Sequence, residues 1–357
     1  MKILSRWIFF ISVSFVAFAN AQNYSWQKLN TEKYKGKQDD IFFINKNEGW
    51  YVNGFGKIFH TTNGGENWEM TTEKKGTFFR CITFLDSKKG FVGNLGTDYF
   101  PNVNDSIPLY KTTDGGENWM PVIYKGKSVK GLCAIDVVKE KYINHGITDY
   151  KHHIFAVGRV GSPANLLVSN DDGDNFRSID MSKYCKMLFD IKMFNKKEGF
   201  ACGASSENLD ETQAQILYTK DGGKTWKIVY QSKRKSETTW KISFPTRTTG
   251  YATLQSYNED KTFSNQHILK TTDGGKTWKE LLLCDDFEAR PFGIGFIDEN
   301  TGFVGTKNSG YYTIDGGKNW MKTDMGNACN KIRIARDENN EIYGYAIGVD
   351  VLKLKTN

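Results

Sequence analysis

Acidic residues in the predicted loops are the side chains of this chain with the most obvious chemical potential. Two carboxylates roughly 5 to 10 Å apart would suit glycoside hydrolysis. The candidate loop acids are Asp98, Asp105, Asp210, Glu211, Glu259, Asp260, Asp285 and Asp286. None lies in a motif that separates a catalytic acid from a solvated loop residue. The motifs G-x-S-x-G, H-E-x-x-H and the phosphate-binding loop do not occur.

Cysteine and histidine spacing predicts neither a metal site nor a cofactor. No C-x-x-C occurs, and His152-His153 has no zinc-type partner spacing. The cysteines are Cys81, Cys133, Cys185, Cys202, Cys284 and Cys329. An even number in an exported chain permits disulfides, but the sequence cannot choose a pairing. Cys81 and Cys202 lie in apolar strand contexts, so buried free thiols are an equally good interpretation.

An eight-residue phrase recurs six times, and it sets the frame that must position any site. The first copy is Thr-Thr-Asn-Gly-Gly-Glu-Asn-Trp, at Thr61 to Trp68, and the spacings between copies are 51, 57, 50, 52 and 42 residues. The third and eighth positions are Asn63 and Trp68, Asp114 and Trp119, Asp171 and Phe176, Asp221 and Trp226, Asp273 and Trp278, and Asp315 and Trp320. Such a period indicates stacked supersecondary units.

The residue types of the phrase fit a tight turn. Adjacent glycines supply positive-φ positions at little cost. The Asp carboxylate and the Thr hydroxyl can accept backbone N–H bonds within the turn. The aromatic ring that follows can bury a large apolar area between strands. We therefore assign a structural role to these positions.

The phrase belongs to a unit of four short antiparallel strands, which we call a to d. Strand a is a short apolar run, strand b begins at Gly-aromatic, strand c precedes the phrase, and strand d begins at its last residue. A seventh unit, from Lys331 to Lys355, ends before its fourth strand. Ser25 to Leu29 resembles a strand d, so we expect the N-terminal strand to complete the last unit. Closure of this kind removes two free sheet edges.

Ser/Thr-x-Asp-x-Gly-x-Thr/Asn-Trp is the Asp-box, or bacterial neuraminidase repeat. With the upstream Gly-aromatic strand, the chain resembles the Asp-box β-propellers: sialidases, sortilin-type receptors, xyloglucanases and, most of all, the photosystem II assembly and stability factors. The resemblance covers residues 24 to 357 and implies an all-β, seven-bladed propeller of four-stranded antiparallel blades. It also implies that the boxes lie away from the functional face. Nothing in the chain points to a photosynthetic partner.

The resemblance gives little support to sialidase or xyloglucanase activity. Sialidases need three arginines on a shared carboxylate and have six blades, and only Arg290-Pro291-Phe292 faintly echoes their Arg-Ile-Pro motif. Xyloglucanases of this type place a cleft between two propellers, whereas this chain is predicted to form a single propeller. We therefore favour a protein without enzymatic activity.

Residues 1–21 are predicted to be a secretory signal peptide, and residues 22–357 the propeller. Lys2 and Arg6 precede an apolar run that ends at Ala19-Asn20-Ala21, a cleavage-site pattern. The run is shorter than a membrane span needs. Removing Lys2 and Arg6 leaves 46 basic and 41 acidic residues, a net charge of +5. This mild excess is spread along the chain and does not favour nucleic-acid binding.

The b–c loops and the d–a loops of a propeller share one face, which we call the loop face; the boxes share the opposite face, the Asp-box face. Unequal b–c loops concentrate on the loop face, where recognition usually occurs. At the channel mouth we expect Phe79, Arg80, Trp240, Lys241, Arg290 and Phe292. A flat face with Arg80 and Arg290 exposed and no paired acids would favour protein binding. The alternative is that the aromatic residues only pack between blades. The predicted ligand-binding residues are Arg80, Tyr99, Phe100, Trp240, Tyr257 and Arg290.

These observations predict an exported, periplasmic or secreted monomer that binds a protein through the loop face. A carbohydrate-active protein, either a glycoside hydrolase or a lectin that uses the same face, is the alternative. Two convergent carboxylates at the channel mouth would favour that alternative. The expected partner is a protein or a glycan of the cell envelope.

Overall fold

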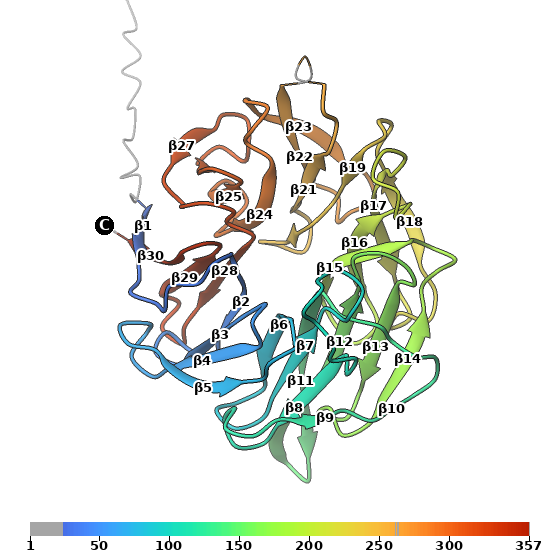
Figure 1. Ribbon diagram of the computed structural model, residues 1–357, viewed down its shortest axis with the longest axis vertical. Coiled ribbons are helices and arrows are strands. Elements are labelled where there is room, and N and C mark those ends of the chain that lie inside the picture. Colours follow the sequence, from blue (N-terminus) through green and yellow to red (C-terminus); the bar gives the residue numbers. More distant parts are fainter. Residues whose placement is uncertain (1–23, 261, 263, 357) are drawn as a thin grey trace, which may run out of the picture.

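The computed structural model describes residues 24–260, 262 and 264–356, which fold into seven sheets around a common axis (Figure 1). All strand pairs in these sheets are antiparallel except that of β10 with β14. We number the sheets as blades in chain order. The predicted signal peptide lies outside the described residues. No helix in the described part of the chain is long and apolar enough to cross a membrane.

The first four blades are formed as follows. Blade 1 contains β2 (Gln38–Phe43), β3 (Gly49–Asn53), β4 (Lys57–Thr61) and β5 (Glu69–Glu73). Blade 2 contains β6 (Phe79–Phe84), β7 (Gly90–Asn94), β8 (Leu109–Thr112) and β9 (Met120–Pro121). Blade 3 contains β11 (Ala134–Asn144), β12 (Ile147–Gly158), β13 (Asn165–Ser169) and β14 (Phe176–Asp180), with β10 (Tyr124–Lys125) at its edge. Blade 4 contains β15 (Met187–Met193), β16 (Gly199–Ala204), β17 (Ala214–Thr219) and β18 (Lys227–Gln231).

The last three blades complete the ring. Blade 5 contains β19 (Glu237–Thr238), β20 (Ile242–Ser243), β21 (Gly250–Ser256), β22 (Asn265–Thr271) and β23 (Lys279–Asp285). Blade 6 contains β24 (Pro291–Phe296), β25 (Gly302–Thr306), β26 (Gly310–Thr313) and β27 (Met321–Thr323). Blade 7 contains β28 (Lys331–Arg336), β29 (Ile342–Ile347), β30 (Val351–Thr356) and the N-terminal β1 (Tyr24–Lys28).

The N-terminal strand completes blade 7, as predicted. β1 pairs antiparallel with β30, placing Trp26 opposite Leu354. Blade 7 in turn packs on blade 1, where the ring of Tyr345 stacks on Phe43 with centroids 3.6 Å apart. The same stack joins Trp50 to Phe84 of blade 2 at 3.6 Å. The Gly-aromatic position of strand b therefore serves as an inter-blade contact.

The Asp-box turns have one hydrogen-bond pattern in all six copies. The first hydroxyl accepts the N–H four residues later at 2.9–3.0 Å and donates to the Asp or Asn Oδ1 at 2.7–3.0 Å. The same Oδ1 also accepts the backbone N–H of the residue four positions later, at 2.9–3.0 Å. Blade 3 keeps this pattern although Asp172, with φ +57°, replaces a glycine. These hydrogen bonds lower the pKa of Asp114 to about 2, because they stabilise the charged carboxylate.

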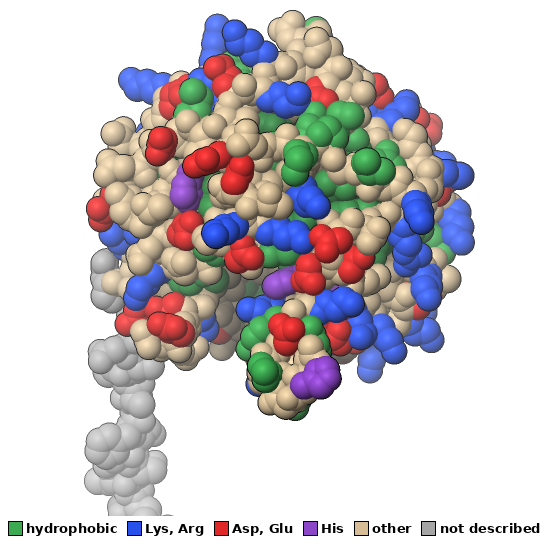
Figure 2. Space-filling model, turned by 90° about the horizontal axis from the view of Figure 1, so that it is seen from below, with side chains coloured by type: hydrophobic (Ala, Val, Ile, Leu, Met, Phe, Trp, Pro, Cys, Tyr) green, Lys and Arg blue, Asp and Glu red, His purple; other side chains and the backbone are tan. Residues whose placement is uncertain are grey.

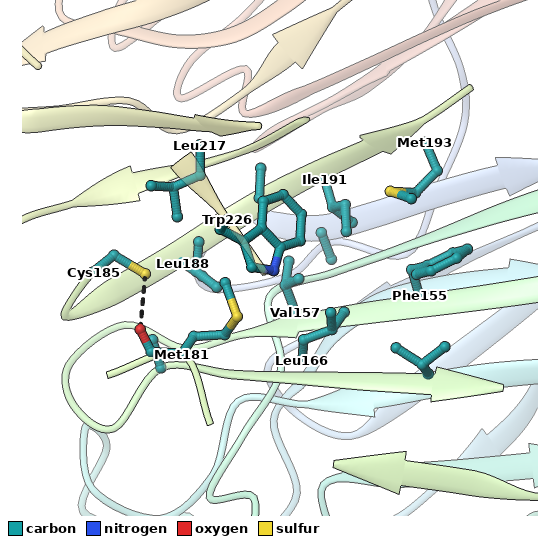
Figure 3. Close-up of a cluster of buried hydrophobic side chains, with 14 residues drawn as sticks. Phe155, Val157, Leu166, Met181, Cys185, Leu188, Ile191, Met193, Leu217 and Trp226 are labelled. Atoms are coloured by element: carbon teal, nitrogen blue, oxygen red, sulfur yellow. Dashed lines mark hydrogen bonds between the residues drawn. The ribbon is translucent and has the colours of Figure 1, made fainter. Parts of the chain in front are cut away.

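The closing aromatic residue of each box is held within or against a blade. In Figure 3 the indole of Trp226 lies among the side chains of Val157, Leu188 and Ile191, which come from blades 3 and 4. The indole N–H of Trp226 also donates to the carbonyl of Gly223 at 3.1 Å. The box therefore anchors strand d to the core of a blade interface.

Two features depart from a regular four-stranded pattern. β11 and β12 form a long a–b hairpin in blade 3. The sequence of this blade lacks the polar-turn phrase found upstream of other boxes. In Figure 2 a small lobe projects from a surface where basic and acidic side chains are interspersed. Strand a of blade 5 is split into β19 and β20, because the N–H groups of Trp240 and Lys241 donate to Thr253 Oγ1.

All six cysteines are free thiols, and five of them are buried. The described residues hold no group of three or more His, Cys, Asp or Glu side chains that could bind a metal ion.

Candidate functional site

Four of the six predicted site residues form a continuous row across blades 2, 5 and 6. The guanidinium of Arg80 lies 5.9 Å from the ring of Trp240, and the indole N–H of Trp240 donates to the Tyr257 hydroxyl at 3.0 Å. The guanidinium of Arg290 lies 5.8 Å from the ring of Tyr257. Both cation–ring distances are within the range of an attractive cation–π contact. The loop face therefore brings these four residues together.

This row is mostly packed, not open. Arg80 is only 8% exposed and pairs with Asp39 of blade 1, so it does not present the exposed guanidinium that would have favoured protein binding. The guanidinium of Arg80 can be buried because its partner acid lies on the adjacent blade. Trp240 stacks on Phe189 of blade 4 at 4.0 Å. Phe79 and Lys241, expected at the mouth, are also buried.

Tyr99 and Phe100 lie apart from that row, in the long loop between β7 and β8. Phe100 stacks on Phe78 at 4.6 Å, and Tyr34 meets Phe55 edge-on at 4.7 Å. These four rings line a cavity of about 580 Å³, which we call the aromatic cavity. Phe55 is 56% exposed and Phe100 is 43% exposed. Large apolar side chains exposed together at a cavity rim make this surface a candidate binding site.

The β7–β8 loop is fixed at its base. The N–H groups of Asn104 and Asp105 both donate to the carbonyl of Gly76, at 2.9 and 3.0 Å. Asp105 also accepts the hydroxyls of Thr77 at 2.6 Å and Tyr110 at 2.7 Å. These bonds account for Asp105, one of the candidate loop acids, as a structural residue. They hold the loop that carries Phe100 against the turn between blades 1 and 2.

Tyr99 packs over a buried cation at the other side of the same loop. The guanidinium of Arg159 lies 5.3 Å from the ring of Tyr99 and donates from Nη2 to Asp98 at 2.5 Å and to the carbonyl of Ser162 at 3.1 Å. The hydrogen bond from Arg159 lowers the pKa of Asp98. Arg159 is buried, and its Nε and Nη1 have no hydrogen-bond partner among the described residues.

Three acids of the central channel accept hydrogen bonds from backbone N–H groups of the next blade. Asp40 accepts the N–H of Ile82 at 3.1 Å, and Asp190 accepts the N–H of Ile242 at 3.2 Å. Asp136 accepts the N–H of Met193 at 2.6 Å. Each bond runs from strand a of one blade to strand a of the next, where no ladder partner exists. These carboxylates therefore satisfy backbone donors that the channel would otherwise leave unpaired.

Each of these acids also faces a cation. Asp40 is bound by Arg333 at 2.9 Å, Asp190 by Lys331 at 3.2 Å, and Asp136 lies 3.5 Å from Lys192. Burial opposes ionisation of Asp40, but Arg333 and Lys331 hold its pKa below its usual value. The arrangement has the form of structural ion pairs. It gives the glycosidase alternative no free carboxylate pair at this level of the channel.

Residues 209–349 match the family model described as Photosynthesis system II assembly factor YCF48. The Photosystem II stability/assembly factor HCF136, chloroplastic, of Arabidopsis thaliana is 20% identical over 291 residues, or 78% of this chain and 61% of that protein. The resemblance to the photosystem II assembly-factor propellers is confirmed. This chain spans about three fifths of the length of that curated relative.

Solved structures show the same fold. The structure titled "YCF48 bound to D1 peptide" superposes with a TM-score of 0.63 at 17% identity, covering 94% of this chain and 97% of that one. YCF48 from Cyanidioschyzon merolae gives 0.64 at 16% identity, covering 92% and 98%. An ancestral GH74 enzyme gives 0.61 at 13% identity, covering 91% of this chain and 45% of that one. At these identities the similarity establishes the propeller fold.

Sequence reasoning missed three walls of the aromatic cavity: Tyr34, Phe55 and Phe78. They come from the segment before β2, the β3–β4 turn and the segment before β6. One signal was available in Gly54-Phe55-Gly56, an aromatic residue between two glycines in a short b–c turn. The other two depend on how the N-terminal segment crosses blade 1, which the repeat pattern does not specify.

Proposed function

We propose that this chain is an exported, non-enzymatic propeller that binds a polypeptide segment of a partner protein in the aromatic cavity on its loop face. The observation that carries the proposal is the cavity itself, with its volume of about 580 Å³ and two exposed phenylalanine rings at its rim. Aromatic anchors in such pockets contribute much of the energy of protein recognition. The signal-peptide pattern of residues 1–21 supports export.

The charges around the cavity suggest the chemistry of the segment. Lys35 and Lys75 are exposed at its rim, and Lys37 also lines it beside one acid, Glu73. An apolar side chain would enter between the rings, and acidic neighbours in the same segment would meet the lysines. A solved propeller of the same fold, titled "YCF48 bound to D1 peptide", supports peptide binding as a use of this architecture.

The test is a selection of displayed random peptides on the purified protein. Phe55→Ala and Phe100→Ala are used for counter-selection, because both rings are exposed and their loss leaves the core intact. Ile314→Ala is the matched control, since it removes an exposed apolar side chain within the blade 6 Asp-box. We expect peptides with an apolar anchor and acidic neighbours, retained by the control and lost by both cavity variants.

A glycan array, run with the same variants, tests the alternative that this chain binds a carbohydrate. An oligosaccharide that binds the wild-type protein and is lost with Phe100→Ala would favour a carbohydrate-binding function. Peptides that bind the cavity variants as well as the wild-type protein would contradict the proposed site.

A further inference from the structure

The centre of the ring contains a second cavity, of about 360 Å³, which is distinct from the aromatic cavity. Strand a residues from blades 1 and 3 to 7 line it. Seven strand a isoleucines border it, namely Ile41, Ile135, Ile191, Ile242, Ile294, Ile332 and Ile334. Six charged residues also line it: Asp136, Asp190, Lys192, Lys241, Lys331 and Arg333.

Solvent reaches this cavity from the Asp-box face. Along β28, Lys331 is buried, Arg333 is half-buried and Ala335 is exposed. Along β15, Asp190 is buried and Lys192 is half-buried. Exposure thus increases toward the a–b turns, which lie on the same face as the boxes. Toward the loop face, the buried Arg80–Asp39 pair and the stack of Trp240 on Phe189 fill the ring.

Lys241 is the cation of this layer without an acid of its own. Asp39 binds Arg80, Asp40 binds Arg333 and Asp190 binds Lys331. Lys241 is 5% exposed, and the one acceptor found for its Nζ among the described residues is the carbonyl of Phe189, at 3.4 Å. An ammonium has three donors to satisfy, and a buried charge without a counter-charge is costly.

The charged groups around Lys241 do not resolve this imbalance. Asp190 and Asp40 attract its ammonium, but both already bind other cations, and Lys331 and Arg80 repel it. Burial, together with repulsion from Lys331 and Arg80, lowers the pKa of Lys241 to about 8, although Asp190 and Asp40 act in the opposite direction. The side chain therefore still carries its charge at neutral pH.

We infer that the buried end of the central channel binds a small oxyanion, a phosphate or a carboxylate, through the Nζ of Lys241. An oxyanion offers several acceptor oxygens to an ammonium that has one long hydrogen bond, and it balances the surplus positive charge. Lys241 is buried, and burial strengthens a charge-assisted bond. The cavity is large enough for a phosphate or for an organic acid of several carbons. This inference does not depend on the proposed peptide binding.

The test is thermal unfolding with added phosphate, acetate or hexanoate, each compared with chloride at the same ionic strength. A ligand that binds only the folded state raises the unfolding midpoint in proportion to the logarithm of its concentration. We expect such a rise for the wild-type protein with at least one probe. Lys241→Met should abolish it, whereas Lys227→Met, which changes an exposed lysine on β18, should retain it.

The probes also distinguish the sources of the oxyanion. A rise with phosphate alone identifies an inorganic anion, and a larger rise with hexanoate than with acetate identifies an organic acid with an apolar body. No rise above chloride with any probe, or an equal rise in Lys241→Met, overturns the inference.

Crystals of the wild-type protein soaked in selenate keep the inference testable if Lys241→Met does not fold. An anomalous peak within hydrogen-bond distance of Lys241 Nζ supports it, and peaks confined to the outer surface overturn it.

Discussion

Alanine substitution of the two glycines in the blade 5 Asp-box should have very different costs. Both Gly274 and Gly275 have positive φ angles, +73° and +82°. A Cβ at Gly274 would meet its nearest atoms, in Arg247, at 3.5 Å, which is ordinary contact. A Cβ at Gly275 would lie 2.2 Å from Cζ of Phe200, a buried ring stacked on Phe244. Gly274→Ala is therefore the matched control for Gly275→Ala.

The magnitudes follow from these contacts. The left-handed conformation costs an alanine roughly 1 to 2 kcal/mol, and both variants incur that cost. Overpacking a close-packed core adds about 1 to 3 kcal/mol, and only Gly275→Ala incurs it. We therefore expect losses in the free energy of unfolding of about 1 to 2 kcal/mol for Gly274→Ala and about 2 to 5 kcal/mol for Gly275→Ala.

Urea unfolding followed by tryptophan fluorescence measures both variants against the wild-type protein. The slope of the transition should stay unchanged, so that the midpoints report stability. Equal midpoints for the two variants would refute the reasoning, because they would mean that the box turn does not press on the blade interface. A loss confined to Gly274→Ala would refute it more strongly.

Three further predictions concern ring closure, acid and channel charge. Trp26→Ala should lower the free energy of unfolding by about 2 to 4 kcal/mol in urea, since the indole packs edge-on to Phe303 at 5.1 Å; an unchanged midpoint would mean that β1 contributes little to the last blade. Hydrogen bonds hold the folded pKa of Asp273 at about 2, below its usual 3.8, so its contribution to stability is present above about pH 4 and lost as pH falls toward 2. Asp273→Asn should reduce that acid dependence in unfolding scans from pH 5 to pH 2, and an unaltered dependence would contradict the assignment. Asp40→Leu should cost about 3 to 5 kcal/mol in urea unfolding because it leaves Arg333 without its acid, and a neutral result would show that solvent compensates for the lost partner.

The repeat predicted most of the fold because its turn chemistry is local. Thr61, Asn63 and the glycines that follow specify one turn by themselves, and the regular spacing then specifies the ring. The β11–β12 hairpin escaped prediction because its outer half is exposed, so no burial pattern marks it. The split between β19 and β20 depends on the hydroxyl of Thr253, which lies on another strand.

The candidate site was less predictable because it depends on contacts between blades. Loop lengths located Phe100 and Tyr257 on the loop face, where the structure places them. The burial of Arg80 could not be foreseen, since its partner Asp39 is 41 residues away on blade 1. The aromatic cavity combines rings from four separate segments, and no single segment carries its signature. A repeat pattern specifies where strands pair, whereas the site depends on what connects them.

The dissociation constant of a selected peptide for the wild-type protein and its cavity variants tests the central claim most directly. Fluorescence anisotropy should show binding weakened at least about tenfold by Phe100→Ala, equivalent to about 1.4 kcal/mol, and unchanged by Ile314→Ala. Equal dissociation constants for the wild-type protein and Phe100→Ala would contradict the account.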